Sequence, residues 1–175
     1  DADGLQKPAA LNRSRKVLQT WLEQRAGVQA ATISVDNGSG LSRKTRASAE
    51  SLGRLLNYGW RSAVMPEFMS SLPVTGEDGT MRKRPLKKGV GHIKTGLLSN
   101  VRSAAGYVLD DEGRRWSVVV MLNSAKFNGR ENAFTDAVLE WCASGRAQAM
   151  LSKEAAALRA ERGVKNADKQ RGALS

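Results

Sequence analysis

The middle of the chain constrains the fold most, because residues 91–123 are typical of three consecutive β-strands. This segment reads "GHIKTGLLSNVRSAAGYVLDDEGRRWSVVVMLN". Two of its runs, "SAAGYVLD" and "RRWSVVVML", are joined by "DDEG", whose Asp and Gly suit a hairpin turn. Together with the preceding strand, which contains Lys94, Thr95 and Gly96, they predict an antiparallel meander.

Helical patterns lie on both sides of this meander in the sequence. The segment "LNRSRKVLQTWLEQRAG" has apolar residues three, four and seven positions apart and ends at Gly27, a common helix stop. Ser48 can cap a second helix, Pro66 begins a shorter one, and Asn128 can cap a last helix over "GRENAFTDAVLEWCA". An antiparallel sheet flanked by helices makes the predicted fold class α+β.

Length and composition predict one folded unit with two extensions. A chain of 175 residues, 41% of them hydrophobic, fits a single core. We expect a leading segment over residues 1–9, the folded unit over 10–146, and a basic, Ala-rich tail over 147–175 that is partly helical or disordered. Residues 74–89 carry three glycines, Pro85 and a basic run, which predicts a long exposed loop.

The charge of the chain narrows the choice of partner without fixing it. The formal net charge is +11 and the pI is near 10.3, which favours nucleic acid, anionic lipid or a carboxylate-bearing wall polymer. One candidate function is therefore a basic nucleic-acid-binding module that uses the run from Arg82 to Lys88 and the basic tail. Against it, the four tryptophans are scattered at core-like positions rather than set in a row for stacking bases.

Other classes of site find no support in the sequence. Cys142 is the only cysteine, which excludes an intramolecular disulfide and a Cys-based metal site. No other metal site and no cofactor is indicated. The longest purely apolar run, Val118 to Leu122, is far shorter than the roughly 20 residues that a membrane-spanning helix needs.

The triplet Lys94-Thr95-Gly96 is the candidate site, because a cation inside an otherwise apolar strand needs a reason. Side chains alternate along a strand, so Lys94 and Gly96 share one face and Thr95 points to the other. A lysine supplies a fixed positive charge, a threonine hydroxyl can bond a carboxylate, and a glycine lets a ligand backbone come close. The combination suits a peptide that ends in a free carboxylate.

Three segments occur in an order that is specific for one enzyme family. They are "DNGSGLSR", "SLPVTGEDGTMRKR", and the Lys-Thr-Gly strand followed by a strand with Ala-Gly-Tyr. In this order they resemble the low-molecular-mass class C penicillin-binding proteins, which are D-alanyl-D-alanine carboxypeptidases and endopeptidases. The resemblance covers roughly Leu11 to Cys142. It implies the C-terminal portion of a penicillin-recognising (β-lactamase/transpeptidase-like) domain.

The resemblance also implies a serine-type reaction that this chain cannot complete alone. The family acylates a serine with the penultimate D-alanine of a peptidoglycan stem peptide and then hydrolyses the acyl-enzyme. It uses Ser-x-x-Lys, Ser-x-Asn and Lys-Thr-Gly motifs, but no serine here has a lysine three residues on or an asparagine two residues on. We therefore expect the nucleophile in an N-terminal half outside this chain, which also begins without an initiator Met, and expect the chain alone to be inactive.

Matching the motifs assigns a role to each candidate site residue. Lys94 is the electrostatic group beside the nucleophile, Thr95 binds the substrate carboxylate, and Gly96 permits close approach. The backbone N–H of Leu97 is one of two oxyanion donors, although the family usually has Ser or Thr at this position and leucine lacks the hydroxyl. Ser39 is assigned to substrate binding, with a purely local bond that ties down its turn as the alternative.

The resemblance finally implies partners and a location. The partners are peptidoglycan stem peptides, β-lactams and the missing N-terminal half, and the location is the periplasm or cell envelope. A non-catalytic remnant that only binds peptidoglycan is a further alternative. Without the strands and helices of the other half, we expect one sheet edge and some apolar surface to be exposed.

Overall fold

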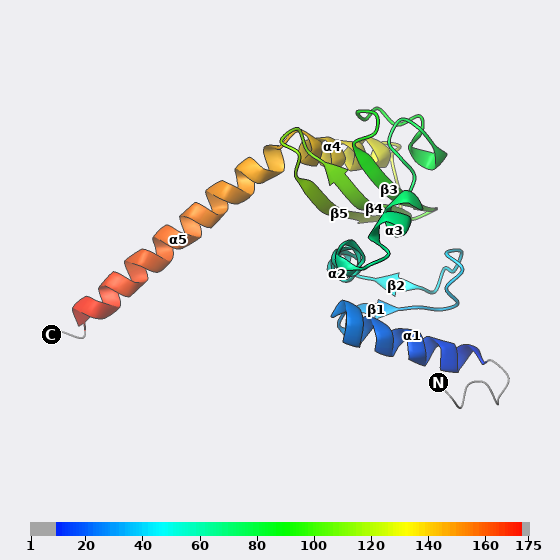
Figure 1. Cartoon of the computed structure of the whole chain (residues 1–175), viewed down its shortest axis with the longest axis horizontal. Helices are drawn as coiled ribbons and strands as arrows, with labels where there is room; N and C mark the ends of the chain where they lie inside the picture. Colours follow the sequence, from blue (N-terminus) through cyan, green and yellow to red (C-terminus); the bar gives the residue numbers. More distant parts are fainter. Residues whose placement is uncertain (1–9, 173–175) are drawn as a thin grey trace.

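A small sheet with helices on both faces forms the centre of the molecule, and one long helix extends away from it (Figure 1). The computed structural model describes the backbone of residues 10–172 and the side chains of residues 10–159. The elements in chain order are α1 (Leu11–Ala26), β1 (Ile33–Ser34), β2 (Arg46–Ala47), α2 (Ala49–Arg61), α3 (Met65–Ser70), β3 (Gly91–Leu98), β4 (Val101–Leu109), β5 (Arg115–Asn123), α4 (Glu131–Ala143) and α5 (Arg146–Gly172).

Strands β3, β4 and β5 form the predicted antiparallel meander, in the order β3-β4-β5. Two residues, Ser99 and Asn100, connect β3 to β4, so the register is fixed close to the turn, with Leu98 opposite Val101. The same register sets Gly96 opposite Ser103 and Leu97 opposite Arg102. Together with the flanking helices, this meander confirms the predicted α+β class.

One face of the sheet packs against α4. Because side chains alternate along a strand, every second residue of the three strands contributes to this core. The buried residues shared between the sheet, α4 and the loop before β3 are Met81, Ile93, Ala104, Val108, Val118, Val120, Leu139, Cys142 and Ala143. The main core of the molecule therefore lies between the meander and α4.

The other face of the sheet packs against α2 and α3 through Tyr107. This side chain is 1% exposed, and its hydroxyl donates a hydrogen bond to the Leu56 carbonyl of α2 at 2.6 Å. Its ring meets the Phe68 ring edge-on, with centroids 6.3 Å apart. Burial raises the pKa of the Tyr107 hydroxyl further above neutral pH. Tyr107 thus joins the helical layer to the sheet.

Helix α1 and the short pair β1–β2 form a layer beneath α2. The buried residues of this layer are Leu22, Ala26, Val28 and Ile33. Gly27 ends α1 in the left-handed conformation at φ 63°, as predicted, and the Ser48 side chain accepts a hydrogen bond from the Ser51 N–H and caps α2. Strand β1 is only two residues long, because the chain turns into the loop 36–45 soon after it.

The segment 74–89 is more deeply packed than its composition predicts. It contains a 3-10 helix, Gly79–Met81, and the Met81 side chain is fully buried. The Thr75 hydroxyl, also buried, donates to the Lys87 carbonyl at 2.8 Å. The prediction of an exposed loop is therefore wrong for these positions, because Met81 belongs to the core that α4 covers.

The start of α4 also differs from the prediction. Asn128 does not cap the helix, which begins at Glu131 after Arg130. Instead the Glu131 carboxylate turns back and accepts hydrogen bonds from the N–H groups of Asn128 and Gly129 at 2.6 and 3.0 Å. The Asn128 side chain accepts from the Arg130 N–H at 3.1 Å. Glu131 therefore ties the loop before α4 to the first turn, where an acidic side chain is favourable, and no side-chain hydrogen bond caps the helix.

Helix α5 continues the chain from the end of α4. It begins after Gly145, which is left-handed at φ 70°. Among its residues up to 159, Ala147 in the first turn is the one that is buried against the core. Beyond that turn it leaves the sheet, and residues 151–159 are exposed (Figure 1). Among the helices within residues 10–172, none combines the length and the apolar character needed to cross a bilayer.

The turn between β4 and β5 is organised by one buried carboxylate, that of Asp110. It accepts hydrogen bonds from the Trp116 ring N–H at 2.9 Å, from the Arg114 side chain at 2.8 Å, and from the backbone N–H groups of Glu112 and Arg114. Burial alone would raise the pKa of Asp110, but these hydrogen bonds outweigh it and lower the pKa to about 2.

We expect Asp110 to contribute to acid sensitivity of the fold. A carboxylate whose pKa is depressed in the folded state stabilises it above the unfolded pKa, here 3.8, and this stabilisation is lost as the pH falls toward about 2. The urea midpoint should therefore fall between pH 4 and pH 2, and Asp110→Asn should reduce that fall while lowering the midpoint at neutral pH. An unchanged pH dependence in the Asp110→Asn variant would contradict this role.

The outer edge of β5 and several apolar side chains lie open to solvent. Within residues 10–172, β5 pairs only with β4 and has no strand on its other side. Leu41 and Val64 are 87% and 61% exposed. Trp21 and Trp60, predicted for the core, are 38% and 41% exposed, so that prediction is wrong for both. The expectation of an open edge and exposed apolar surface is confirmed for this part of the chain.

Candidate ligand cleft along strand β3

The outer edge of β3 is paired at its start and open at its end. The Ile93 N–H donates to the Pro73 carbonyl at 2.8 Å, and the Thr75 N–H donates to the Gly91 carbonyl at 2.9 Å. These two residues of β3 therefore point their backbone groups away from β4. Because the direction alternates along a strand, the N–H and C=O groups of Thr95 and Leu97 point to the same side, where no other described strand pairs with them.

Lys94 lies on the face of β3 that looks toward α2 and α3. It shares this face with His92 and Gly96, as the alternation predicts. The Lys94 side chain is exposed, and its ammonium group donates a hydrogen bond to the Thr95 carbonyl at 2.8 Å. That carbonyl points to the open edge, so the cation lies along the edge. His92 has a separate contact, between its Nδ1 and the Met69 carbonyl at 3.2 Å.

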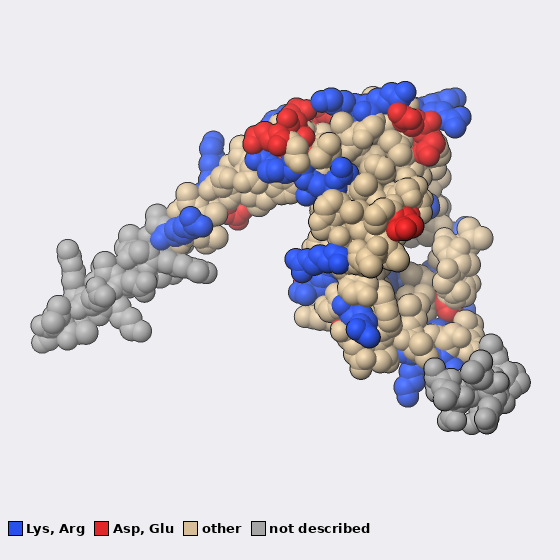
Figure 2. All heavy atoms as spheres, viewed as in Figure 1, with Lys and Arg blue, Asp and Glu red and all other residues tan. Residues whose placement is uncertain are grey.

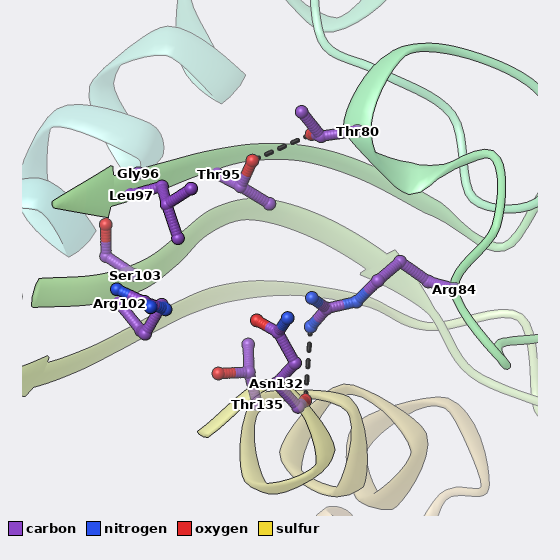
Figure 3. Close-up of a pocket in the computed structure, with 9 residues that line it drawn as sticks. All are labelled: Thr80, Arg84, Thr95, Gly96, Leu97, Arg102, Ser103, Asn132 and Thr135. Atoms are coloured by element: carbon purple, nitrogen blue, oxygen red, sulfur yellow. Dashed lines mark hydrogen bonds between the residues drawn. The ribbon is translucent and has the colours of Figure 1, made fainter. Parts of the chain in front are cut away.

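Gly96 has a partner across the strand pair that a larger residue would displace. A Cβ at this position would lie 2.4 Å from the Oγ of Ser103, the residue directly opposite on β4. Figure 3 shows the Ser103 oxygen beneath Gly96. The glycine therefore gives room to a hydroxyl of the protein itself as well as to any ligand that approaches the edge.

A pocket of about 220 Å³ lies on the opposite face of β3, between this strand and the start of α4. The Thr95 hydroxyl points toward the loop 74–89 and shares a hydrogen bond of 2.7 Å with the Thr80 hydroxyl (Figure 3). Two positively charged side chains, those of Arg84 and Arg102, form part of the pocket wall. The residues that line it are Thr80, Arg84, Thr95, Gly96, Leu97, Arg102, Ser103, Asn132 and Thr135.

Arg84 fixes one wall of this pocket. Its Nε donates to the Asp136 carboxylate of α4 at 2.6 Å. Its Nη2 donates to the Asn132 carbonyl at 3.2 Å, a bond that Figure 3 marks with a dashed line. The side chains of Arg84 and Asp136 are only 14% and 11% exposed. This buried ion pair holds the loop 74–89 against α4 and neutralises the charge of Arg84.

Ser39 is not part of the pocket. It lies in the loop between β1 and β2, where its hydroxyl donates to the Asn37 side chain at 2.8 Å and accepts from the Leu41 N–H at 3.1 Å. The same loop is held by Asp36, whose carboxylate accepts from the Ser42 hydroxyl at 2.6 Å and pairs with Arg15. Both bonds of Ser39 are local ones, of the kind that shape a turn.

The structure thus brings three of the five predicted site residues to one pocket. Thr95, Gly96 and Leu97 line it, whereas Lys94 projects from the opposite face of the strand and Ser39 lies elsewhere. Sequence reasoning gave no role to Arg102, Thr80 or Asn132. For Arg102 a signal existed, because a two-residue turn at Ser99-Asn100 places residue 102 opposite residue 97. No cluster of metal-binding side chains occurs in the part of the chain that the structure describes.

Most of the basic side chains between Arg82 and Lys88 form ion pairs with acidic side chains. Besides the buried pair of Arg84, Lys87 pairs with Asp111 at 2.9 Å and Lys88 pairs with Glu77 at 3.4 Å. Figure 2 shows Asp and Glu side chains beside the Lys and Arg side chains of this region. This mixed surface is unlike the single-sign patch of a nucleic-acid interface.

Comparison with known proteins decides the family. The model of the D-Ala-D-Ala carboxypeptidase 3 (S13) family matches residues 2–144. The chain belongs to this family. It is similar to the D-alanyl-D-alanine carboxypeptidase of Actinomadura sp. (strain R39), with 35% identity over 95 residues, which cover 50% of this chain and 18% of that protein. It is also similar to the D-alanyl-D-alanine carboxypeptidase DacB of Haemophilus influenzae, with 28% identity over 67% of this chain and 25% of that protein.

Solved structures of penicillin-binding proteins and endopeptidases share the fold of this chain. Penicillin binding protein 4 (dacB) from Haemophilus influenzae, complexed with a novel β-lactam, superposes with a TM-score of 0.62 at 24% identity over 73% of this chain and 30% of that chain. The Bd0816 predatory endopeptidase from Bdellovibrio bacteriovorus superposes with a TM-score of 0.64 at 16% identity over 76% of this chain and 37% of that chain. The sheet and its helices therefore have the fold of the corresponding part of these proteins, which confirms the predicted fold class, and the chain spans well under half the length of these relatives.

Proposed function

We propose that this chain forms the β3 side of the ligand cleft of a serine-type D-alanyl-D-alanine carboxypeptidase or endopeptidase. In this proposal the ligand, a peptidoglycan stem peptide or a β-lactam, lies along the open edge of β3. The observation that carries it is the edge itself, where the backbone groups of Thr95 and Leu97 point outward beside the Lys94 cation, in a chain of the S13 family.

An extended peptide can bind this edge as an additional strand. Unpaired N–H and C=O groups at a sheet edge bind extended peptides through main-chain hydrogen bonds, and side-chain pockets then give specificity. The outward groups of Thr95 and Leu97 supply such bonds. The pocket beside them can take one side group or the chain end, and it is lined by the Thr95 hydroxyl.

In this proposal each residue of the Lys94–Leu97 segment of β3 has its own role in the acylation and hydrolysis steps. A serine hydroxyl attacks the carbonyl carbon of the penultimate D-alanine, the peptide bond breaks, the departing amine takes a proton, and water later hydrolyses the ester. The outward N–H of Leu97 stabilises the oxyanion that forms in each step. Lys94 stabilises negative charge near the serine, and Thr95 bonds the ligand carboxylate. Gly96 permits the close approach. The assignment of Ser39 to substrate binding rests on the motif match alone, because its two hydrogen bonds lie within its own turn.

The serine and its base are supplied by residues that this chain does not contain. No Ser-x-x-Lys or Ser-x-Asn motif occurs in the 175 residues, so we expect the chain alone to be inactive. An N-terminal half of the same enzyme would bring these motifs to β3 and cover the open edge of β5. Because the substrate is cell-wall peptide, this proposal places the protein in the periplasm or cell envelope.

Intact mass spectrometry with a penicillin tests this proposal. We expect a drug-sized adduct on the protein expressed from its complete natural reading frame and none on the 175-residue chain. In the longer protein, Lys94→Ala should slow acylation by about a hundredfold or more, because it removes the positive charge that this proposal sets beside the developing negative charge. Lys83→Ala is the matched control, since Lys83 is an exposed lysine of the basic run.

Two results would contradict the proposal. The absence of an adduct on the longer protein would exclude the acyl-enzyme and leave β3 as a binding edge at most. Equal acylation rates for Lys94→Ala and Lys83→Ala would remove Lys94 from the reaction while leaving the enzyme class intact.

A further inference from the structure

Arg102 has an unusual position at the mouth of the pocket beside β3. The β3–β4 register sets it directly opposite Leu97 on the face that looks toward α4. One guanidinium nitrogen, Nη1, donates to the carbonyls of Leu98 and Val101 in the hairpin. The guanidinium centre lies 4.8 Å from the centre of the Phe127 ring. The hairpin and the ring therefore hold the group in one orientation.

The rest of the Arg102 guanidinium is available for a ligand. Its contacts use Nη1, which leaves Nε and Nη2 without a hydrogen bond to any described residue. No carboxylate of residues 10–159 forms an ion pair with it. The other arginine of the pocket differs, because Arg84 is matched by Asp136 at 2.6 Å. Since no acidic residue lines the pocket, it carries one unmatched positive charge.

Glu131 is the acidic residue whose position could compete for Arg102. Burial opposes the ionisation of its carboxyl, but hydrogen bonds from the backbone of Glu131, Asn128 and Gly129, followed by the charge of Arg102, lower its pKa. The carboxylate is thus ionised, but its Oε1 accepts the N–H groups of Asn128 and Gly129. Glu131 therefore shapes the loop before α4. Its interaction with Arg102 is electrostatic, without a hydrogen bond or an ion pair between the two side chains.

We propose that Arg102 is a specificity-determining residue that binds the terminal carboxylate of the ligand together with the Thr95 hydroxyl. This inference rests on the proposed function and names the group that selects its substrate. Leu97 has no hydroxyl to offer a carboxylate, and Arg102 is its cross-strand neighbour on the same face. The planar fork of a guanidinium matches the two oxygens of a carboxylate, and such charge-assisted bonds are about twice as strong as neutral ones.

The size and chemistry of the pocket suit this ligand group. A water molecule takes about 30 Å³ in the liquid, so a pocket of about 220 Å³ has room for a carboxylate, its small side chain and several waters. The hydroxyl pair of Thr80 and Thr95, 2.7 Å apart, provides a second polar contact. Thr80 can accept the Thr95 proton or donate its own, so the pair adapts to a carboxylate acceptor.

Binding of two peptides that differ only in charge tests this inference. The probes are N-acetyl-D-alanyl-D-alanine and its C-terminal amide, titrated by calorimetry into the protein expressed from its complete natural reading frame. We expect the acid to bind more tightly than the amide by about tenfold or more, because charged hydrogen bonds exceed neutral ones. Arg102→Gln should reduce this preference to nearly one, whereas Arg102→Lys should keep part of it.

Three further variants make the result specific to Arg102. Arg130→Gln removes the same charge from an exposed residue near the pocket that does not line it, and should leave the preference unchanged. Phe127→Leu keeps the charge but removes the ring that orients it, and should weaken the preference. In the Arg102→Gln background, Leu97→Ser should restore part of the preference, because it supplies the hydroxyl that Leu97 lacks.

The outcomes separate this inference from the proposed function. A full acid preference in both Arg102→Gln and Phe127→Leu would overturn the role of Arg102 while leaving the enzyme class in place. An equal loss in Arg130→Gln would reduce the role of Arg102 to general charge. If neither peptide binds and no penicillin adduct forms, the proposed function fails, and this inference fails with it.

Discussion

Gly106→Ala should abolish the folded sheet. A Cβ at residue 106 of β4 would lie 2.0 Å from the His92 carbonyl oxygen and 3.0 Å from the Ile93 Cα, and both are backbone atoms of β3. Backbone atoms in a paired strand cannot move aside as a flexible side chain can. We expect a loss of more than about 4 kcal/mol, the range reached only by a few severe mechanisms, which removes most of the stability of a small domain. Thermal unfolding followed by circular dichroism measures this loss.

Gly53→Ala provides the matched control for this variant. Gly53 lies inside α2, has an ordinary helical conformation, and would place its Cβ more than 4 Å from other groups. The same chemical change should therefore stabilise the protein, by about 0.5–1 kcal/mol, because alanine is the better helix former. Opposite signs at the two glycines are the expected result. A Gly106→Ala variant that melts within a few degrees of the unchanged protein would show that β3 and β4 are farther apart than described.

The meander could be predicted because its information is local. Each strand carries its own apolar pattern, and the turns between them have the residues that hairpins need, so residues 91–123 determine their own pairing. The same locality explains the correct end of α1 at Gly27 and the cap of α2 by Ser48. These features depend on residues a few positions apart in the chain.

The features that were missed depend on residues far apart in the chain. Met81 is surrounded by glycines and basic residues, and only its contact with the core beneath α4 makes it buried. From the sequence, Arg84 is one of several basic residues in a charged run. Its ion pair with Asp136, which lies 52 positions later in the chain, is evident only in the structure. The role of Arg102 follows from the register and from Phe127. Burial and charge pairing of this kind cannot be read from local composition.

The features of the candidate site fall into the same two groups, those that follow from the local sequence and those that depend on distant contacts. The motif Lys94-Thr95-Gly96 is contiguous, and the alternation of a strand correctly separates Lys94 from Thr95. The outward direction of the Leu97 N–H depends on the bonds of Gly91 and Ile93 to the segment 73–75, which no local pattern predicts. The wall of the pocket likewise comes from α4 and the loop before β3. The sequence therefore identified the strand, and only the structure identified the space beside it.

Asp136→Leu should destabilise the protein nearly as strongly as a core deletion. The side chain of Arg84 is 14% exposed, and without its partner it would remain as a buried and unmatched charge. Breaking one half of a buried ion pair typically costs about 3–5 kcal/mol, whereas replacing both halves with apolar residues is often neutral. The double variant Arg84→Met with Asp136→Leu should therefore recover most of the loss. Urea unfolding at neutral pH compares the single and the double variant.

The exposed pair between Lys87 and Asp111 serves as the control in the same segment. These side chains are 65% and 58% exposed, so Asp111→Leu should change the free energy of unfolding by less than about 1 kcal/mol. Equal losses at Asp136 and Asp111 would show that the segment 74–89 does not depend on the buried pair.

Because Arg84 also forms a wall of the pocket, Asp136→Leu should release that wall and weaken peptide binding even where the variant stays folded. The double variant should restore stability without restoring binding, since it returns the packing but not the guanidinium contact to Asn132.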